Sequence, residues 1–220
     1  ARPDKIAATI PTERLHLRGE LNEGEGNTLH FEQDGMPVTA TANDGFAWVS
    51  GRGDKKALAV KPGEAFALPT AGDFESDQPF SYGVWIRPMK KDLGGAVFAR
   101  MDSGNNYRGW DLWLEGGKPG THIVSTWPDD ALKVVANKAI EAKRWTHVFV
   151  TYDGSAKAAG VKIYIDGEVQ STGVQADKLA GTTRTTVPFK IGQRNTTSPL
   201  DTAGIQDVRI YDRVLEPTEI

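Results

Sequence analysis

The sequence has no cysteine, no strong net charge and no long apolar run, and each absence excludes a class of structure or function. Without cysteine the chain forms no disulfide and offers no thiolate, although this identifies no cellular compartment. Its 26 basic and 29 acidic residues leave a net charge of −3 and form no basic block, so we expect no nucleic-acid partner. No apolar stretch approaches the roughly 20 residues that span a bilayer, so we expect no membrane insertion.

Catalytic and metal-binding motifs are also scarce. No serine lies in a G-x-S-x-G motif, and no glycine-rich segment carries the full pattern of a nucleotide-binding loop. The four histidines form neither an H-E-x-x-H motif nor a closely spaced pair, so no zinc site is predicted.

The sequence does contain repeated alternation of apolar and polar residues, which is typical of half-buried β-strands. Glycine-rich turn signals such as "EGGKPG" and "YDGSAKAAG" separate these segments. Many short strands divided in this way predict an all-β antiparallel sandwich or barrel. The clearest predicted strands are Phe80–Pro88, Trp110–Glu115, Thr121–Trp127, Trp145–Tyr152, Val161–Gly167 and Asp207–Tyr211.

Two segments have a helical signal. Leu132, Val135 and Ile140 within Asp129–Lys143 are spaced as on one face of a helix, and the segment is rich in good helix formers. Near the end of the chain, Pro217 suits the first turn of a short C-terminal helix.

The segment "NNYRGWDLWLEGG" contains the best candidate site. On a strand, Trp110 shares one face with two leucines and is expected in the core, whereas Asp111, Trp113 and Glu115 share the other face. The backbones of the two acidic residues would lie roughly 13 to 14 Å apart, which is too far for a glycosidase pair.

Trp113 between these charged residues could form a flat apolar platform for a sugar ring. Tyr107, Arg108 and Asp111 would then supply hydrogen-bonding groups, so these four residues are the predicted ligand contacts. The alternative is a half-exposed tryptophan that only covers a neighbouring loop.

Taken together in their order, several segments resemble the laminin-G-like, concanavalin A-like lectin/glucanase domain. The middle of the chain is most similar to the version embedded in large planctomycete proteins that also carry c-type cytochrome modules, although the haem motif C-x-x-C-H is absent here. The segments that carry the resemblance are "LRGELNEGEGN", "FSYGVWIRP", "WTHVFVTYDG", "VKIYIDG", "FKIGQ" and "GIQDVRIYDRVLEPTEI".

The resemblance implies a jelly-roll-like sandwich of two curved antiparallel sheets. It implies strand, turn and strand rather than a helix within Asp129–Lys143. It also implies one laminin-G-like domain over residues 15–220, preceded by an N-terminal extension or strand lead-in over residues 1–14.

Members of this family differ in function, so the fold alone assigns none. The glucanase motif E-x-D-x-x-E is incomplete here, because Glu75 and Asp77 are followed by Pro79 and Phe80, which disfavours catalysis. Many relatives hold one structural calcium ion, and Asp207 matches the aspartate that contributes to it. A surface Asp207 paired with Arg209 or with a turn amide is the alternative.

These observations predict a non-catalytic binding module of a larger exported protein, with a glycan as the leading ligand. The alternatives are a domain that docks onto other proteins or onto other domains of the parent protein, and a glycan-active enzyme. A periplasmic or cell-surface location follows from the resemblance only, because "ARPDKIAATIP" at the start has no apolar signal segment.

Overall fold

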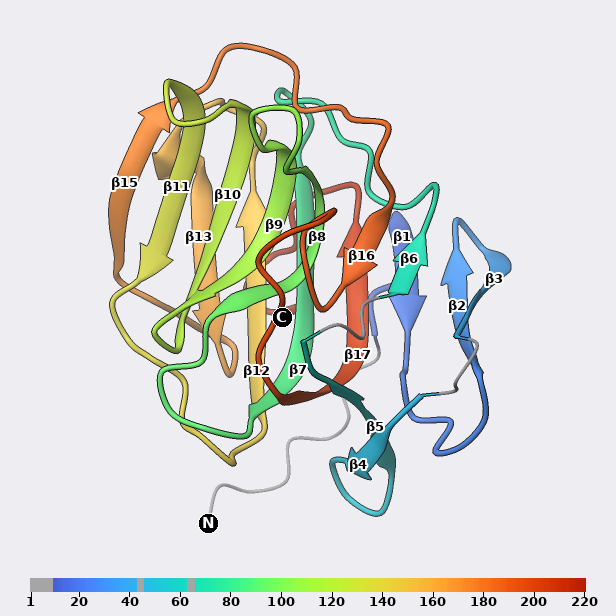
Figure 1. The fold of residues 1–220 in the computed structure, drawn as a ribbon. Coiled ribbons are helices and arrows are strands. Elements are labelled where there is room, and N and C mark those ends of the chain that lie inside the picture. The colour runs from blue at the N-terminus through green and yellow to red at the C-terminus, as the bar shows by residue number, and fades with distance from the viewer. Residues whose placement is uncertain (1–9, 43–45, 63–65) are drawn as a thin grey trace.

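The predicted all-β sandwich is confirmed. The computed structural model describes residues 10–42, 46–62 and 66–220, and all further structural statements concern these residues. They form two antiparallel sheets packed face to face, one of ten strands and one of seven (Figure 1). The only helical element among them is one turn of 3-10 helix, η1 (Ala158–Gly160).

The larger sheet runs in the order β14 (Glu168–Val169), β13 (Val161–Ile165), β12 (Thr146–Tyr152), β7 (Phe80–Pro88), β17 (Ala203–Tyr211), β1 (Leu15–Gly19), β2 (Thr28–Gln33) and β3 (Met36–Thr41), with β4 (Trp48–Ser50) and β5 (Lys56–Val60) joined to it through β17. The smaller sheet runs in the order β15 (Thr172–Lys178), β11 (Asp130–Ala136), β10 (Lys118–Thr126), β9 (Arg108–Glu115), β8 (Gly95–Asp102), β16 (Phe189–Ile191) and β6 (Phe66–Leu68).

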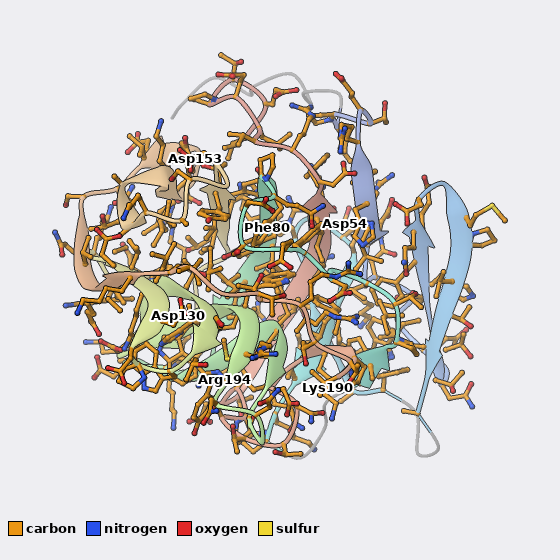
Figure 2. The ribbon with its side chains drawn as sticks, turned by 90° about the horizontal axis from the view of Figure 1, so that it is seen from above. Asp54, Phe80, Asp130, Asp153, Lys190 and Arg194 are labelled. Atoms are coloured by element: carbon orange, nitrogen blue, oxygen red, sulfur yellow. The ribbon has the colours of Figure 1, made fainter. Side chains whose placement is uncertain are left out.

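The core lies between the sheets and follows from the alternation of each strand. Val148 and Val150 on β12 and Val208 and Ile210 on β17 point inward and are buried, as their spacing predicts. At the centre of the core the ring of Trp110 lies 4.6 Å from that of Tyr82 and 5.3 Å from that of Phe80. Figure 2 labels Phe80 near the middle of the molecule and Arg194 beside the strands of the smaller sheet.

The segment Asp129–Lys143 does not form a helix. Residues Asp130–Ala136 form β11, which pairs with β10 on one side and with β15 on the other. These pairings bury Leu132 and Val134 in the core, and this gain outweighs the weak helical preference of the isolated segment. The predicted second strand is wrong, because residues 137–145 run through turns to β12.

The predicted C-terminal helix is also wrong. After Pro217 the chain makes a single turn, in which the amide of Glu219 donates to the carbonyl of Glu216. The carboxylate of Glu219 binds the guanidinium of Arg213, and this ion pair ties the end of the chain back to the segment after β17.

Most of the predicted N-terminal extension, residues 1–14, lies outside the described residues; the description starts at Ile10, and the first strand begins at Leu15. Among the described residues, no helix has the length and apolar character needed to cross a bilayer.

Candidate functional site

The hairpin of β9 and β10 forms the base of the candidate site. Gly116 and Gly117 connect the two strands with φ of 58° and 77°, the left-handed values that a two-residue type I′ turn requires. This turn sets the register in which Asp111 lies opposite His122 and Trp113 lies opposite Gly120. As the alternation predicts, Trp110 faces the core, and Asp111 and Trp113 face the outer side of the smaller sheet together with His122.

Small side chains leave room on this outer face. Ala96 and Ala99 on β8 and Ala131 on β11 lie around the hairpin, and the larger rings of Tyr107 and Trp113 pack against them. The result is a pocket of about 240 Å³, which we call the aromatic pocket. It is lined by Met101, Tyr107, Trp113, His122, Val124, Trp127, Lys133 and Arg194.

A buried charged cluster underlies the aromatic pocket. The carboxylate of Asp111 is 0% exposed and accepts hydrogen bonds from Nε and Nη2 of Arg194, at 2.9 and 2.7 Å. Its other oxygen accepts from the backbone amide of His122 at 2.8 Å and lies 3.0 Å from Nδ1 of the same ring. Nη2 of Arg194, which only donates, lies 3.2 Å from the same Nδ1, so this ring nitrogen contacts both an acceptor and a donor.

The electrostatics of the cluster favour the ionised carboxylate. Burial by itself would raise the pKa of Asp111, but the charges and hydrogen bonds of His122 and Arg194 outweigh it and lower the pKa to about 2. The ion pair therefore persists at neutral pH.

Arg194 comes from the loop after β16 and reaches across the sheet to the hairpin (Figure 2). Its guanidinium carbon lies 4.6 Å from the ring centre of Trp113 and 5.3 Å from that of Tyr107, within the range of cation–π contacts. Asp111 binds this side chain from below, and the two rings lie against its guanidinium. The side chain of Arg194 is therefore held in one orientation.

Two of the four predicted ligand contacts, Tyr107 and Trp113, line the aromatic pocket. The predicted role of Asp111 needs correction, because its buried carboxylate cannot reach a ligand and instead orients Arg194 and His122. Arg108 lies outside the pocket lining, where its Nε donates to the carbonyl of Ser125.

Sequence reasoning missed His122, Trp127, Lys133 and Arg194. The two-glycine turn was a usable signal for His122, because a hairpin closed there places residue 122 opposite residue 111. Lys133 lies opposite His122 on the next strand, β11. The sequence of this segment also has a helical signal, so it did not place Lys133 beside the hairpin. For Arg194, 83 positions from Asp111, no local signal exists.

A larger hollow of about 510 Å³ lies against the ten-stranded sheet, but its charged groups mostly pair with one another. Arg209 binds the carboxylate of Asp207 through both Nε and Nη2, and Arg18 donates to Glu20 at 2.7 Å. The smaller aromatic pocket is therefore the better candidate for ligand binding.

The surroundings of Asp207 do not fit a calcium ion. Its carboxylate is paired with Arg209, the alternative that the sequence left open, and Nη2 of Arg52 lies 3.8 Å away. Two guanidinium groups repel a divalent cation. Within the described residues, no group of three or more histidine or acidic side chains is arranged to hold a metal.

We therefore expect a chelator to leave the melting temperature unchanged, and we expect Asp207→Asn to destabilise the protein equally with and without calcium. The physical reason is that Asp207 balances Arg209 and Arg52. Thermal melts of both proteins in calcium and in chelator check this. A melting temperature that rises with calcium in the parent but not in the variant would restore the calcium site.

Because of His147 on β12, we expect the folded protein to lose stability in mild acid. Burial, and next the charge of Arg209, lower its pKa from 6.5 to about 4. The unfolded chain therefore takes up a proton at this residue between pH 6.5 and 4 while the folded chain does not, so stability falls as the pH falls through this window. The resulting loss in the free energy of unfolding is about 3 kcal/mol at most.

Urea unfolding at pH 7 and at pH 4 measures this loss. In His147→Gln, which keeps a polar side chain of similar length, we expect the part due to this residue to disappear. An equal loss in parent and variant would assign the acid sensitivity to other groups.

Glu75 and Asp77, the remains of the glucanase motif, lie in the loop before β7. The carboxylate of Glu75 accepts hydrogen bonds from Thr182 Oγ1 and from the amide of Thr183, so it fastens this loop to the segment after β15. This arrangement does not resemble a pair of catalytic acids on one strand.

Comparison with known proteins agrees with this architecture. A family model described as the concanavalin A-like lectin/glucanases superfamily matches residues 61–220. The match covers well over half of the chain, which therefore belongs to this superfamily. No curated protein matches the chain in sequence.

Solved structures show the same fold at low sequence identity. The binding domain of Paraclostridial mosquitocidal protein 1 aligns with a TM-score of 0.71 at 15% identity, covering 94% of this chain and 51% of the other. The receptor binding domain of botulinum neurotoxin type G has a TM-score of 0.60 at 14% identity, over 94% and 49%. The sialidase of Trypanosoma rangeli has a TM-score of 0.65 at 14% identity, over 96% and 33%. The chain thus spans about half of the toxin domains.

Proposed function

We propose that this chain is a non-catalytic carbohydrate-binding module of a larger exported protein. The observation that carries the proposal is the aromatic pocket, in which three aromatic rings surround a few fixed polar groups on an otherwise small-residue face. Sugar rings have apolar faces and hydroxyl edges, and aromatic platforms with orienting polar groups match both.

The polar atoms of the pocket suit sugar hydroxyls. Within the described chain, no hydrogen bond uses Nη1 of Arg194, which can donate to a ligand oxygen. Nε2 of His122 takes part in no hydrogen bond among the described residues, so it is available to a sugar hydroxyl, which can both donate and accept. Pockets for drug-sized ligands measure roughly 300 to 1,000 Å³, so a pocket of about 240 Å³ suits a single ring.

The comparisons support a binding module at the level of the fold. The two toxin structures are binding domains. Domains of this superfamily are common in extracellular proteins, which supports export of the parent protein.

A glycan array tests the proposal. We expect the parent protein to bind a defined set of glycans and Trp113→Ala to lose at least about tenfold in affinity, because the ring that stacks on the sugar is gone. Trp85→Ala is the matched control, since Trp85 is a half-buried tryptophan on the outer face of the other sheet.

Equal binding by Trp113→Ala and the parent would show that the aromatic pocket is not the glycan-binding site. If the parent protein binds no glycan on the array, the proposal fails, and the docking domain without sugar activity becomes the better interpretation.

A further inference from the structure

The charged side chains that line the aromatic pocket are all of one sign. Both charged side chains of the lining, Lys133 and Arg194, are cations. No carboxylate and no side-chain amide is among the described lining residues. A site for a neutral sugar needs both donors and acceptors, because each hydroxyl is both, whereas this lining supplies mainly donors.

The nearby carboxylates do not correct the imbalance. Asp111 is 0% exposed, and its two oxygens are used by Arg194 and His122. Glu115 lies outside the lining, where its oxygens accept from Nζ of Lys133 at 2.7 Å and from Nε2 of Gln175 at 3.1 Å. A ligand therefore meets donors in the pocket and meets no open carboxylate.

Two further donors belong to the tryptophans. Nε1 of Trp113 is buried and has no hydrogen-bond partner within the described residues. Trp127 adds a second indole to the lining, with Nζ of Lys133 6.0 Å from its ring centre. An indole N–H donates only, so neither tryptophan supplies the acceptor that a neutral sugar needs.

We infer that the aromatic pocket selects a sugar that carries a carboxylate, such as a uronic or sialic acid, with the carboxylate placed against Nη1 of Arg194. The inference rests on the proposed carbohydrate-binding function and names the class of sugar. A carboxylate accepts through both oxygens without donating, which is the chemistry that the lining leaves unsatisfied.

Arg194 is suited to this role because its position is set before the ligand arrives. Asp111 holds two of its nitrogens, and the rings of Tyr107 and Trp113 lie against its guanidinium. Little side-chain freedom is lost on binding. Arg194 as a whole is 8% exposed, so its guanidinium interacts with an anion more strongly than a fully solvated arginine does.

Matched glycan pairs test the inference. Polygalacturonic acid and sialyllactose are compared with carboxyl-reduced polygalacturonic acid and with lactose, which lack the carboxylate, by titration calorimetry at low and high salt. We expect the acidic member of at least one pair to bind at least about tenfold more tightly, and we expect this preference to shrink at high salt.

The double variant Asp111→Asn/Arg194→Gln removes the guanidinium without leaving a lone buried charge. We expect it to keep the far-ultraviolet circular dichroism of the parent, to bind the neutral glycans more weakly than the parent does because one donor is gone, and to lose the preference for the acidic ones. Lys162→Gln is the control, because it removes one exposed charge from β13 on the other sheet.

The outcomes separate the inference from the proposed function. Neutral and acidic glycans bound equally tightly by the parent would overturn the inference and leave the carbohydrate-binding function standing. A preference that persists in the double variant would overturn the role of Arg194. If no glycan of either kind binds, the proposed function fails and the inference fails with it.

Discussion

Trp110→Ala is expected to lower the free energy of unfolding by about 3 to 5 kcal/mol, the usual cost of removing a large buried ring. Trp110 is 1% exposed and touches the rings of Phe80, Tyr82 and Phe98. Its Nε1 donates to the carbonyl of Gly72 at 2.7 Å, so alanine also leaves that carbonyl without its partner.

Trp113→Ala is the matched comparison, three residues along the same strand. Its ring is half-buried on the outer face and packs beside small side chains, so we expect a loss of only about 1 kcal/mol. Urea unfolding followed by circular dichroism measures both variants. Similar losses for the two tryptophans would contradict the assignment of one to the core and the other to the pocket.

Asp111→Asn is expected to lower the free energy of unfolding by about 3 to 5 kcal/mol, because it leaves the guanidinium of Arg194 in a buried site without its anion. Arg194→Gln is expected to have a similar effect, since it leaves the carboxylate of Asp111 beside His122 alone. In the double variant no uncompensated charge remains, so its loss should be clearly smaller than the sum of the two single losses.

A double-mutant cycle of urea unfolding measures this coupling. Additive losses would show that the pair contributes no interaction energy. The pH dependence gives a second measurement. Because the pKa of Asp111 is lowered from 3.8 to about 2, its contribution to stability is complete above about pH 4 and is lost as the pH falls through about 2.

Much of the fold could be predicted from the sequence, because strand alternation is a local property. All six predicted strands exist, and the side of the sheet that each of Trp110, Trp113 and Val148 faces follows from a period of two. The prediction was least secure where local preference and pairing disagree. The segment after Asp129 shows this, since its helical preference lost to the neighbouring strands β10 and β15.

The candidate site was only half predictable for the same reason. Tyr107 and Trp113 stand out in the sequence as aromatic residues beside charged ones. The residues next to Asp111 in the sequence, however, do not indicate that its carboxylate will be buried. Its environment depends on Arg194, which lies 83 positions away in a loop with no regular pattern. Asp207 is a similar case, since its neighbour Arg52 is brought to it from the turn before β5.

The sequence by itself determined the strands, the turns between them and the inner or outer direction of most side chains, because these depend on residues close together in the chain. Only the tertiary structure decided that Arg194 and Trp127 converge with Tyr107, Trp113 and His122 on one pocket, and that Asp111 supports this pocket from below. The physical reason is that burial, charge pairing and the shape of a pocket depend on distances through space, which follow from the packing of the whole chain.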